Sequence, residues 1–221
     1  MAVEPLATTN RQLVSRLQSH GWASLTVSVY LEAAVIDVAR GLGDVVRRRD
    51  GTMTEELSPR GREGTQKASL SRRFGLGAFP LHCDTAHLPL PCRYIVLGCQ
   101  STGAVRTPTL LLDTDGLCLS EPDKALAHSA LFCVRNGRRS FYTSMLDDAR
   151  PFLRVDPGCM EPIGEDAVDA MKLFSHEREE TIAFEWVEGA ILVIDNWRVL
   201  HGRGNEADAD IGRRLTRAYV R

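Results

Sequence analysis

The chain has 221 residues, of which 43% are hydrophobic and 25% charged, as is typical of a globular protein that buries a substantial core. The 27 Lys and Arg and 29 Asp and Glu residues give a formal net charge of −2, which provides no electrostatic basis for binding nucleic acid or an anionic membrane. No signal-peptide pattern occurs, and no apolar run approaches the roughly 20 residues of a membrane span, so we expect a cytoplasmic protein with a single domain over residues 1–221.

Two amphipathic helices are predicted in the first 45 residues, flanking the rest of the domain. Residues 11–20 have apolar side chains at helical spacing, and Gly21 follows as the expected end. Residues 31–42 repeat this pattern and are followed by Gly43. Residues 47–73 are polar and rich in Arg, Gly and Ser, which predicts a long loop or lid whose arginines are solvated.

From residue 79 onward the chain consists of short apolar or alternating runs, which predicts a mainly β core. The clearest expected strands are residues 93–99, 109–112, 131–134, 139–143, 181–187, 190–194 and 214–220. Hairpin-type turns are expected at Asn136-Gly137 and Glu188-Gly189. Only two helices are predicted among the strands, at residues 122–130 and 165–176. This order favours a β-sandwich or jelly roll, because a parallel sheet would need a helix between most strands.

The most informative short motif is His82-Cys83-Asp84. On an extended strand, residues two apart share one face, so His82 and Asp84 would point together and Cys83 would point away as a structural residue. One more imidazole, for which His201 is the candidate, would complete two histidines and one carboxylate, the ligand set of non-haem Fe(II) oxygenases. His87 lies three residues after Asp84 and is expected to be a pocket-wall or structural residue rather than a ligand.

The six cysteines are scattered along the chain without a C-x-x-C pair. This spacing argues against a zinc ribbon or a dithiol motif. With no export signal, reduced and buried thiols are expected rather than a disulfide framework.

Four segments occur in an order that carries a family resemblance: residues 79–87, 107–113, 195–203 (D-N-W-R-V-L-H-G-R) and 213–219. In these segments the chain resembles the TauD/TfdA-like, or clavaminate synthase-like, Fe(II)/2-oxoglutarate-dependent dioxygenases. The resemblance covers roughly two-thirds of the chain. It implies a mainly β double-stranded β-helix, a cupin-like jelly roll, with its core over residues 79–221 and flanking helices over residues 1–45.

The resemblance also implies a role for each motif residue. His82, Asp84 and His201 would hold Fe(II), and the retained carboxylate favours hydroxylation or desaturation over halogenation. Arg213 would bind the distal carboxylate of 2-oxoglutarate, because a guanidinium offers a planar fork of donors, and Thr109 would add a hydrogen bond to the same cosubstrate.

Further residues are expected to shape the pocket or to contact the substrate. Arg217 lies four residues after Arg213, on the same face of a strand, and would bind the substrate or complete the cosubstrate pocket. Residues 195–197 are expected to shape the turn that delivers His201 and to hydrogen-bond to a ligand. Candidate substrate contacts are Arg154, Ser69, Ser71 and Trp197, each with a packing or structural role as the alternative.

The implied activity couples oxidative decarboxylation of 2-oxoglutarate by O2 to hydroxylation or desaturation of a C–H bond in a small anionic or zwitterionic metabolite. A first alternative is a catalytically silent 2-oxoglutarate-binding or regulatory protein on the same scaffold. A second alternative is a cupin-type isomerase or hydrolase that uses Zn(II) or Mn(II). The expected partner is a small-molecule substrate, with no nucleic acid and no membrane.

Overall fold

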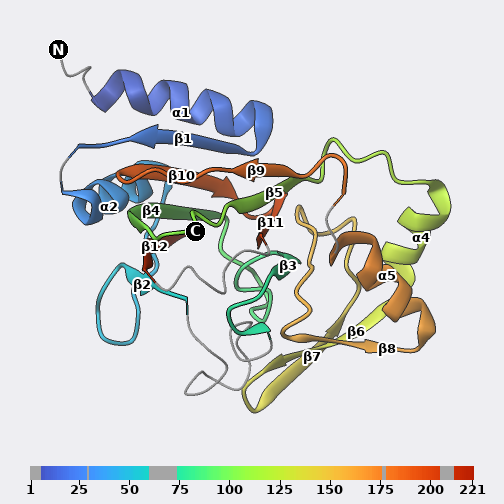
Figure 1. Cartoon of the computed structure of the whole chain (residues 1–221). Helices are drawn as coiled ribbons and strands as arrows, with labels where there is room; N and C mark the ends of the chain where they lie inside the picture. The colour runs from blue at the N-terminus through green and yellow to red at the C-terminus, as the bar shows by residue number, and fades with distance from the viewer. Residues whose placement is uncertain (1–5, 29, 60–73, 176–177, 205–211) are drawn as a thin grey trace.

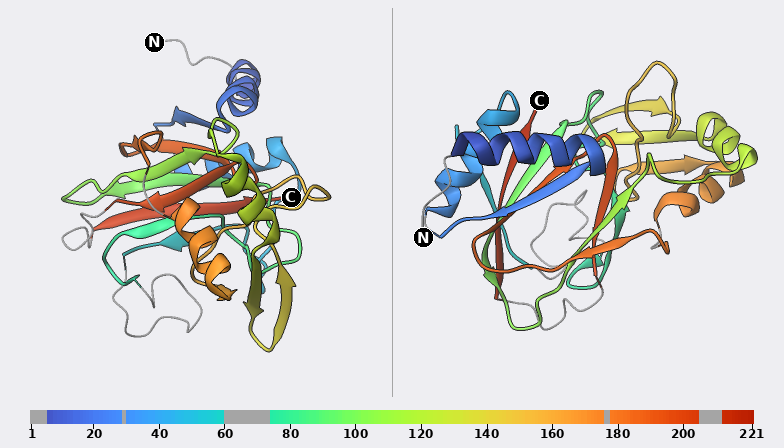
Figure 2. Two further views of the ribbon diagram at one scale, coloured as in Figure 1. Left: turned by 90° about the vertical axis from the view of Figure 1, so that its right-hand side faces the viewer. Right: turned by 90° about the horizontal axis from the view of Figure 1, so that it is seen from above.

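Two antiparallel sheets face each other and form the body of the protein (Figures 1 and 2). The computed structural model describes residues 6–28, 30–59, 74–175, 178–204 and 212–221. The larger sheet has the strand order β1 (Trp22–Thr26), β10 (Ala190–Asp195), β4 (Tyr94–Thr102), β12 (Arg213–Val220) and β2 (Glu55–Leu57). The smaller sheet has the order β3 (Phe79–His82), β11 (Val199–Arg203), β5 (Thr109–Asp113) and β9 (Ile182–Phe184). This mainly β jelly-roll arrangement confirms the expected fold class.

A third sheet lies to one side of the body, with two helices beside it (Figure 1). Its strands are β7 (Arg139–Thr143), β6 (Leu131–Asn136) and β8 (Met160–Ile163), and its helices are α4 (Glu121–Ser129) and α5 (Glu165–Ser175). The Ser120 side chain caps α4 by accepting a hydrogen bond from the Asp123 N–H at 3.3 Å. The expected turn at Asn136-Gly137 joins β6 to β7.

Helices α1 (Leu6–His20) and α2 (Leu31–Leu42) cover the outer face of the larger sheet (Figure 2). Their apolar stripes form one buried cluster with side chains from β1, β4, β10 and β12. The approach of α2 depends on Gly98 of β4, since a Cβ at this position would lie 2.6 Å from Cγ2 of Val35. The two predicted N-terminal helices therefore serve as a cover for the sheet.

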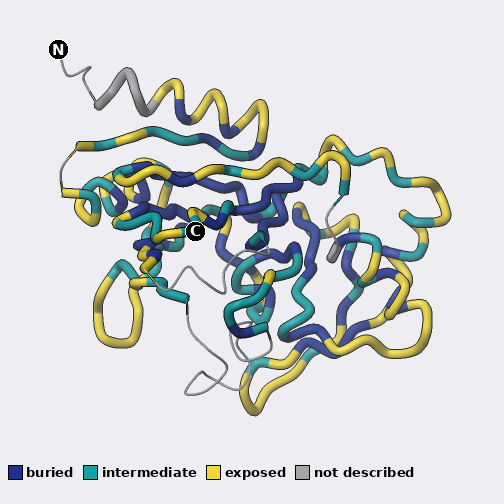
Figure 3. Tube along the Cα trace, viewed as in Figure 1, coloured by how far each residue is buried: buried dark blue, intermediate teal, exposed yellow. Residues whose placement is uncertain are grey.

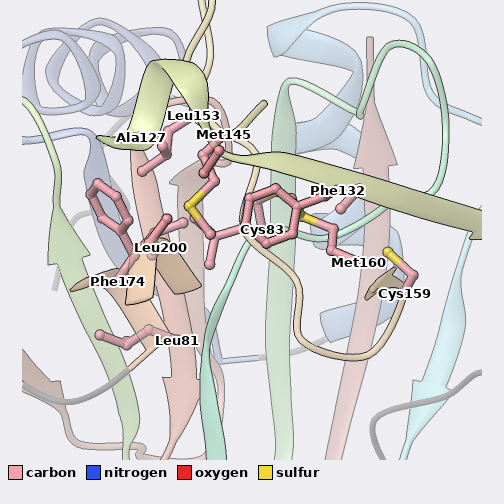
Figure 4. Packing of buried hydrophobic residues seen from close by; sticks show 14 of the residues in the cluster. Leu81, Cys83, Ala127, Phe132, Met145, Leu153, Cys159, Met160, Phe174 and Leu200 are labelled. Atoms are coloured by element: carbon pink, nitrogen blue, oxygen red, sulfur yellow. The ribbon is translucent and has the colours of Figure 1, made fainter. Parts of the chain in front are cut away.

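The buried residues concentrate along the paired strands (Figure 3). One cluster fills the space between the two large sheets and includes the fully buried Trp186. Another joins the third sheet and its helices to β3 and β11, and Figure 4 shows Leu81, Cys83 and Leu200 packed there with Phe132 and other side chains. Both clusters adjoin β11, which holds this strand firmly in place.

The structure differs from the sequence-based expectations at several elements. Helix α1 begins at Leu6 rather than at residue 11, and β9 covers Ile182–Phe184 rather than residues 181–187. Strand β1 lies inside the region expected to contain only flanking helices. Strand β2 lies inside the expected loop of residues 47–73, because pairing with β12 orders a segment with little strand propensity of its own. None of the described helices has the length and hydropathy needed to cross a membrane.

Candidate metal centre

Three side chains with metal-binding atoms converge where β3 meets β11. His82 lies directly opposite His201 in the ladder, and their ring centroids are 4.4 Å apart. Asp84 lies two residues beyond His82, past the end of β3 rather than on the strand as expected. One ligand atom from each of the three residues lies within 4.8 Å of the others. His82 Nε2 is 3.6 Å from Asp84 Oδ1, and His201 Nε2 is 3.8 Å from Asp84 Oδ2.

The local sequence explains why these strands come so close together. Gly202 follows His201, and a Cβ at this position would lie 2.7 Å from the Phe79 carbonyl oxygen, so a larger residue would push β11 away from β3. Leu81, Cys83 and Leu200 alternate with the histidines and are buried in the neighbouring hydrophobic cluster. This burial agrees with the structural role expected for Cys83. It also raises the pKa of the Cys83 thiol to about 12.

Asn196 holds the backbone of Asp84 in place. Its Oδ1 accepts a hydrogen bond from the Asp84 N–H at 2.8 Å, while Nδ2 donates to the Asp84 and Cys92 carbonyl oxygens at 3.0 and 2.8 Å. The side chain is 1% exposed. Of residues 195–197, Asn196 therefore makes the expected contact with a candidate ligand, through the backbone of Asp84.

The Asp84 carboxylate is held by two donors from β12. Arg217 Nη1 and the Tyr219 hydroxyl each donate to Oδ2 at 2.9 Å. Arg217 Nη2 also donates to Glu55 Oε2 at 2.8 Å. The same Glu55 oxygen forms a second ion pair with Arg48 Nη1 at 2.9 Å. Strand β12 of the larger sheet thus supplies both hydrogen-bond donors to the carboxylate of Asp84, which follows β3 of the smaller sheet.

The charge states of Asp84 and His201 suit a divalent metal. Burial alone would raise the pKa of Asp84, but Arg217 and the two histidines hold it well below its ordinary value, so the carboxylate is ionised. Burial and the neighbouring His82 lower the pKa of His201 to about 3, which keeps this imidazole neutral with a lone pair for a metal. Burial opposes protonation of His82, but the nearby Asp84 carboxylate more than offsets it and raises the pKa.

Hydrogen bonding at His82 also directs one nitrogen toward the shared space. Its Nδ1 lies 2.9 Å from the Pro80 carbonyl oxygen, so Nδ1 carries the proton and Nε2 is left to bind a metal. His201 Nδ1 is buried and has no hydrogen-bond partner among the described residues. Two imidazoles and one carboxylate on one side of a shared space are the donors expected for Fe(II), so the residues present fit this metal.

The two residues expected to bind the cosubstrate are both buried, Thr109 on β5 beside β11 and Arg213 at the start of β12. Thr109 pairs with Arg203, two residues after His201, and its Oγ1 accepts a hydrogen bond from Trp186 Nε1 at 3.0 Å. Arg213 donates from Nη1 to the Thr107 carbonyl oxygen at 2.8 Å. Along β12, Arg213 and Arg217 point to the same side as expected, while Arg214 between them is exposed.

Arg154, an expected substrate contact, has a different position. Its guanidinium is fully buried and donates to the carbonyl oxygens of Ala86, Leu88 and Pro89 in the loop that follows Asp84. The guanidinium carbon lies 5.1 Å from the ring centroid of Phe141 and 5.2 Å from that of Phe152. The structure therefore gives Arg154 a role in holding this loop and leaves no exposed surface for a substrate.

Trp197 lies on the outer side of the turn that carries Asn196. Its Nε1 donates to the Pro91 carbonyl oxygen at 3.1 Å, and its ring packs against Phe152 and the Arg93 guanidinium. It lines a surface groove with α1 side chains, which matches the packing alternative. Ser69 and Ser71 lie outside the described residues.

Three residues at this centre were not singled out from the sequence. Tyr219 could have been found, because it follows Arg217 by two residues on a predicted strand and so shares its face. Glu55 lies in a polar segment whose sequence pattern indicates neither a strand nor a functional site. From the sequence, Trp186 was indicated only as an apolar residue of a predicted strand. Its contact with Thr109 depends on the pairing of β5 with β9.

Comparison with known proteins agrees with this geometry. Residues 120–219 match the family model described as taurine catabolism dioxygenase TauD, TfdA family. No curated protein matches the sequence of the chain. The matched segment contains His201, Arg213 and Arg217 but begins after His82 and Asp84.

Solved structures of iron oxygenases share the whole fold. An asparagine oxygenase in complex with Fe(II), 2S,3S-3-hydroxyasparagine and succinate superposes with a TM-score of 0.77 at 19% identity, over 97% of this chain and 79% of that chain. The non-heme iron oxygenase OrfP, in complex with Fe, succinate and (3S)-hydroxy-L-Arg, gives a TM-score of 0.72 at 18% identity, over 98% and 81%. PvcB from Pseudomonas aeruginosa gives a TM-score of 0.64 at 17% identity, over 96% and 79%.

Proposed function

We propose that the chain is a TauD/TfdA-like Fe(II)/2-oxoglutarate-dependent dioxygenase that hydroxylates or desaturates a C–H bond of a small anionic or zwitterionic metabolite, because residues 120–219 match that family model and the fold matches that of iron oxygenases. The observation that carries the proposal is the convergence of His82, Asp84 and His201 with their ligand atoms within 4.8 Å of one another. In the proposed enzyme these three residues bind the metal, and Fe(II) together with 2-oxoglutarate supplies the activation of O2.

The chain's own residues would bind and orient the cosubstrate. Arg213 and Thr109 are proposed to take the distal carboxylate of 2-oxoglutarate, because both are buried and offer hydrogen-bond donors. The Trp186 N–H already occupies one lone pair of Thr109 Oγ1, which leaves the hydroxyl proton to donate to a carboxylate. Arg217 is proposed to pair with a carboxylate of the substrate or cosubstrate, since it is a partly buried cation in contact with Asp84.

An amino acid is the substrate class to test first. The structural neighbours are bound to hydroxylated asparagine and hydroxylated arginine, which are zwitterions. Around Asp84 this chain carries both a cation, Arg217, and an anion, Glu55, in one connected network. Such a network is able to match the carboxylate and the ammonium group of one small zwitterion.

The test is turnover of the purified protein loaded anaerobically with Fe(II) and 2-oxoglutarate and then exposed to O2. We expect succinate, at a slow rate alone and faster with the right member of a panel of amino acids. His201→Ala should abolish succinate formation, whereas His128→Ala, a change on the exposed end of α4, should leave it unchanged.

Other outcomes would contradict the proposal. Tight binding of 2-oxoglutarate without succinate under any of these conditions would identify a silent binding protein. Turnover of another substrate with Zn(II) or Mn(II), and none with Fe(II), would identify the isomerase or hydrolase alternative.

A further inference from the structure

The two oxygens of the Asp84 carboxylate have different surroundings. Oδ2 accepts hydrogen bonds from Arg217 Nη1 and from the Tyr219 hydroxyl, both at 2.9 Å. Among the described residues no hydrogen bond to Oδ1 is found, and His82 Nε2 lies 3.6 Å from it, beyond hydrogen-bond distance. Because a carboxylate oxygen has two lone pairs in its plane, Oδ2 is already saturated and Oδ1 is available.

We propose that Tyr219 and Arg217 are positioning residues that restrict Asp84 to binding the metal through Oδ1 alone. The inference rests on the proposed function, since it concerns how the carboxylate of that metal centre is oriented. It assigns a role to Tyr219, which is neither a metal ligand nor a cosubstrate contact in the function proposed above.

The number of oxygens that Asp84 contributes matters for this chemistry. A metal held by two histidines and one carboxylate oxygen keeps open positions for a chelating keto acid and for O2. A carboxylate that binds through both oxygens would occupy one of these positions. The two donors on Oδ2 oppose that arrangement, because the metal could bind Oδ2 only if one of these hydrogen bonds were broken.

The fold holds both donors rigidly. Arg217 and Tyr219 alternate with buried residues on β12, which is paired along its length with β4, so both side chains point toward Asp84. Arg217 is fixed a second time by Glu55 of β2, and its guanidinium lies 4.6 Å from the centroid of the Tyr219 ring. Glu55 is therefore the anchor of this group, and it lies on the strand directly beside β12.

Tyr219→Phe tests the inference, with Tyr142→Phe as the matched control because Tyr142 is 67% exposed on β7. Each purified protein is titrated anaerobically with Co(II), and the visible spectrum of the bound metal is recorded because it reports the coordination number. We expect Tyr219→Phe to bind Co(II) about 10-fold more weakly, with a spectrum that differs from that of the wild type because the second carboxylate oxygen changes the ligand set. Tyr142→Phe should match the wild type in both measurements.

A purely structural role for Tyr219 would give a different result. It would lower the melting temperature of the metal-free protein while leaving the Kd for Co(II) and the spectrum unchanged, and that result would overturn the inference. A weaker Kd with an unchanged spectrum would overturn it as well, because the coordination through a single oxygen would not depend on Tyr219.

Glu55→Gln is a second variant, for use if Tyr219→Phe does not fold. Loss of the charge should loosen Arg217 and shift the Kd and the spectrum in the same direction by a smaller factor, and no shift would count against the inference. The proposed function fails separately, if the wild-type protein binds neither Co(II) nor Fe(II) or forms no succinate. Wild-type turnover combined with an unaltered Tyr219→Phe variant would remove only the positioning role.

Discussion

Replacing Asn196 with alanine should weaken both the fold and the metal centre. The substitution removes the three hydrogen bonds that tie Asp84 N, Asp84 O and Cys92 O to a side chain that is 1% exposed. Each such bond contributes about 1 kcal/mol net, so the free energy of unfolding should fall by about 3 kcal/mol. In a chain of this size that loss corresponds to a decrease in Tm of roughly 6–12 °C.

The assay is urea unfolding of the metal-free protein followed by far-UV circular dichroism, combined with anaerobic Co(II) titration at a temperature where each variant is folded. Because Asp84 loses the support of its backbone, Co(II) binding should weaken about 10-fold. Gln18→Ala, a change on the exposed face of α1, serves as the control and should alter neither quantity. Asn196→Asp keeps the acceptor for the Asp84 N–H but turns a carboxylate toward two carbonyl oxygens, so it should destabilise at least as much as alanine.

The reasoning about Asn196 would be refuted by an alanine variant that unfolds within 1 kcal/mol of the wild type (roughly the worth of one bond) and binds Co(II) equally well. Either result alone would separate the two roles of the side chain. Unchanged stability with weaker metal binding would limit Asn196 to orienting Asp84. Lower stability with unchanged metal binding would limit it to holding the loop.

Three further predictions follow from buried groups elsewhere in the fold. Arg154→Met should lower the free energy of unfolding by about 3 kcal/mol in urea, because three loop carbonyls lose their donors, and a loss below 1 kcal/mol would argue against the loop-holding role. Gly98→Ala should lower the free energy of unfolding by about 1–3 kcal/mol through overpacking against Val35. The control Gly116→Ala, whose Cβ would meet nothing closer than 3.9 Å, should change this free energy little. Equal effects of the two substitutions would contradict the close packing of α2. A thiol reagent at neutral pH should modify Cys118 rapidly and the five buried cysteines only after unfolding, so a native Cys118→Ser protein that still reacts fast would disprove the assigned burial.

Local pattern was sufficient for much of the fold. Helix α2 has the predicted bounds, and α5 begins at the predicted residue, because an apolar stripe at helical spacing is strong enough to be recognised alone. Strand β2 could not be found in this way. Its three residues include two glutamates, and only the hydrogen bonds to β12 make the segment a strand.

The metal centre was likewise predicted in part from the sequence and decided in part by the tertiary structure. The sequence alone determined the identities of His82, Asp84 and His201 as candidate ligands, because ligand chemistry depends on residue type and the spacing of two of them is local. The tertiary structure decided how the centre is held: Asp84 lies past the strand, Asn196 supports its backbone, and Tyr219 and Arg217 bind one of its oxygens. These contacts join residues more than 100 positions apart, and such pairings arise from sheet topology and packing that no local pattern encodes.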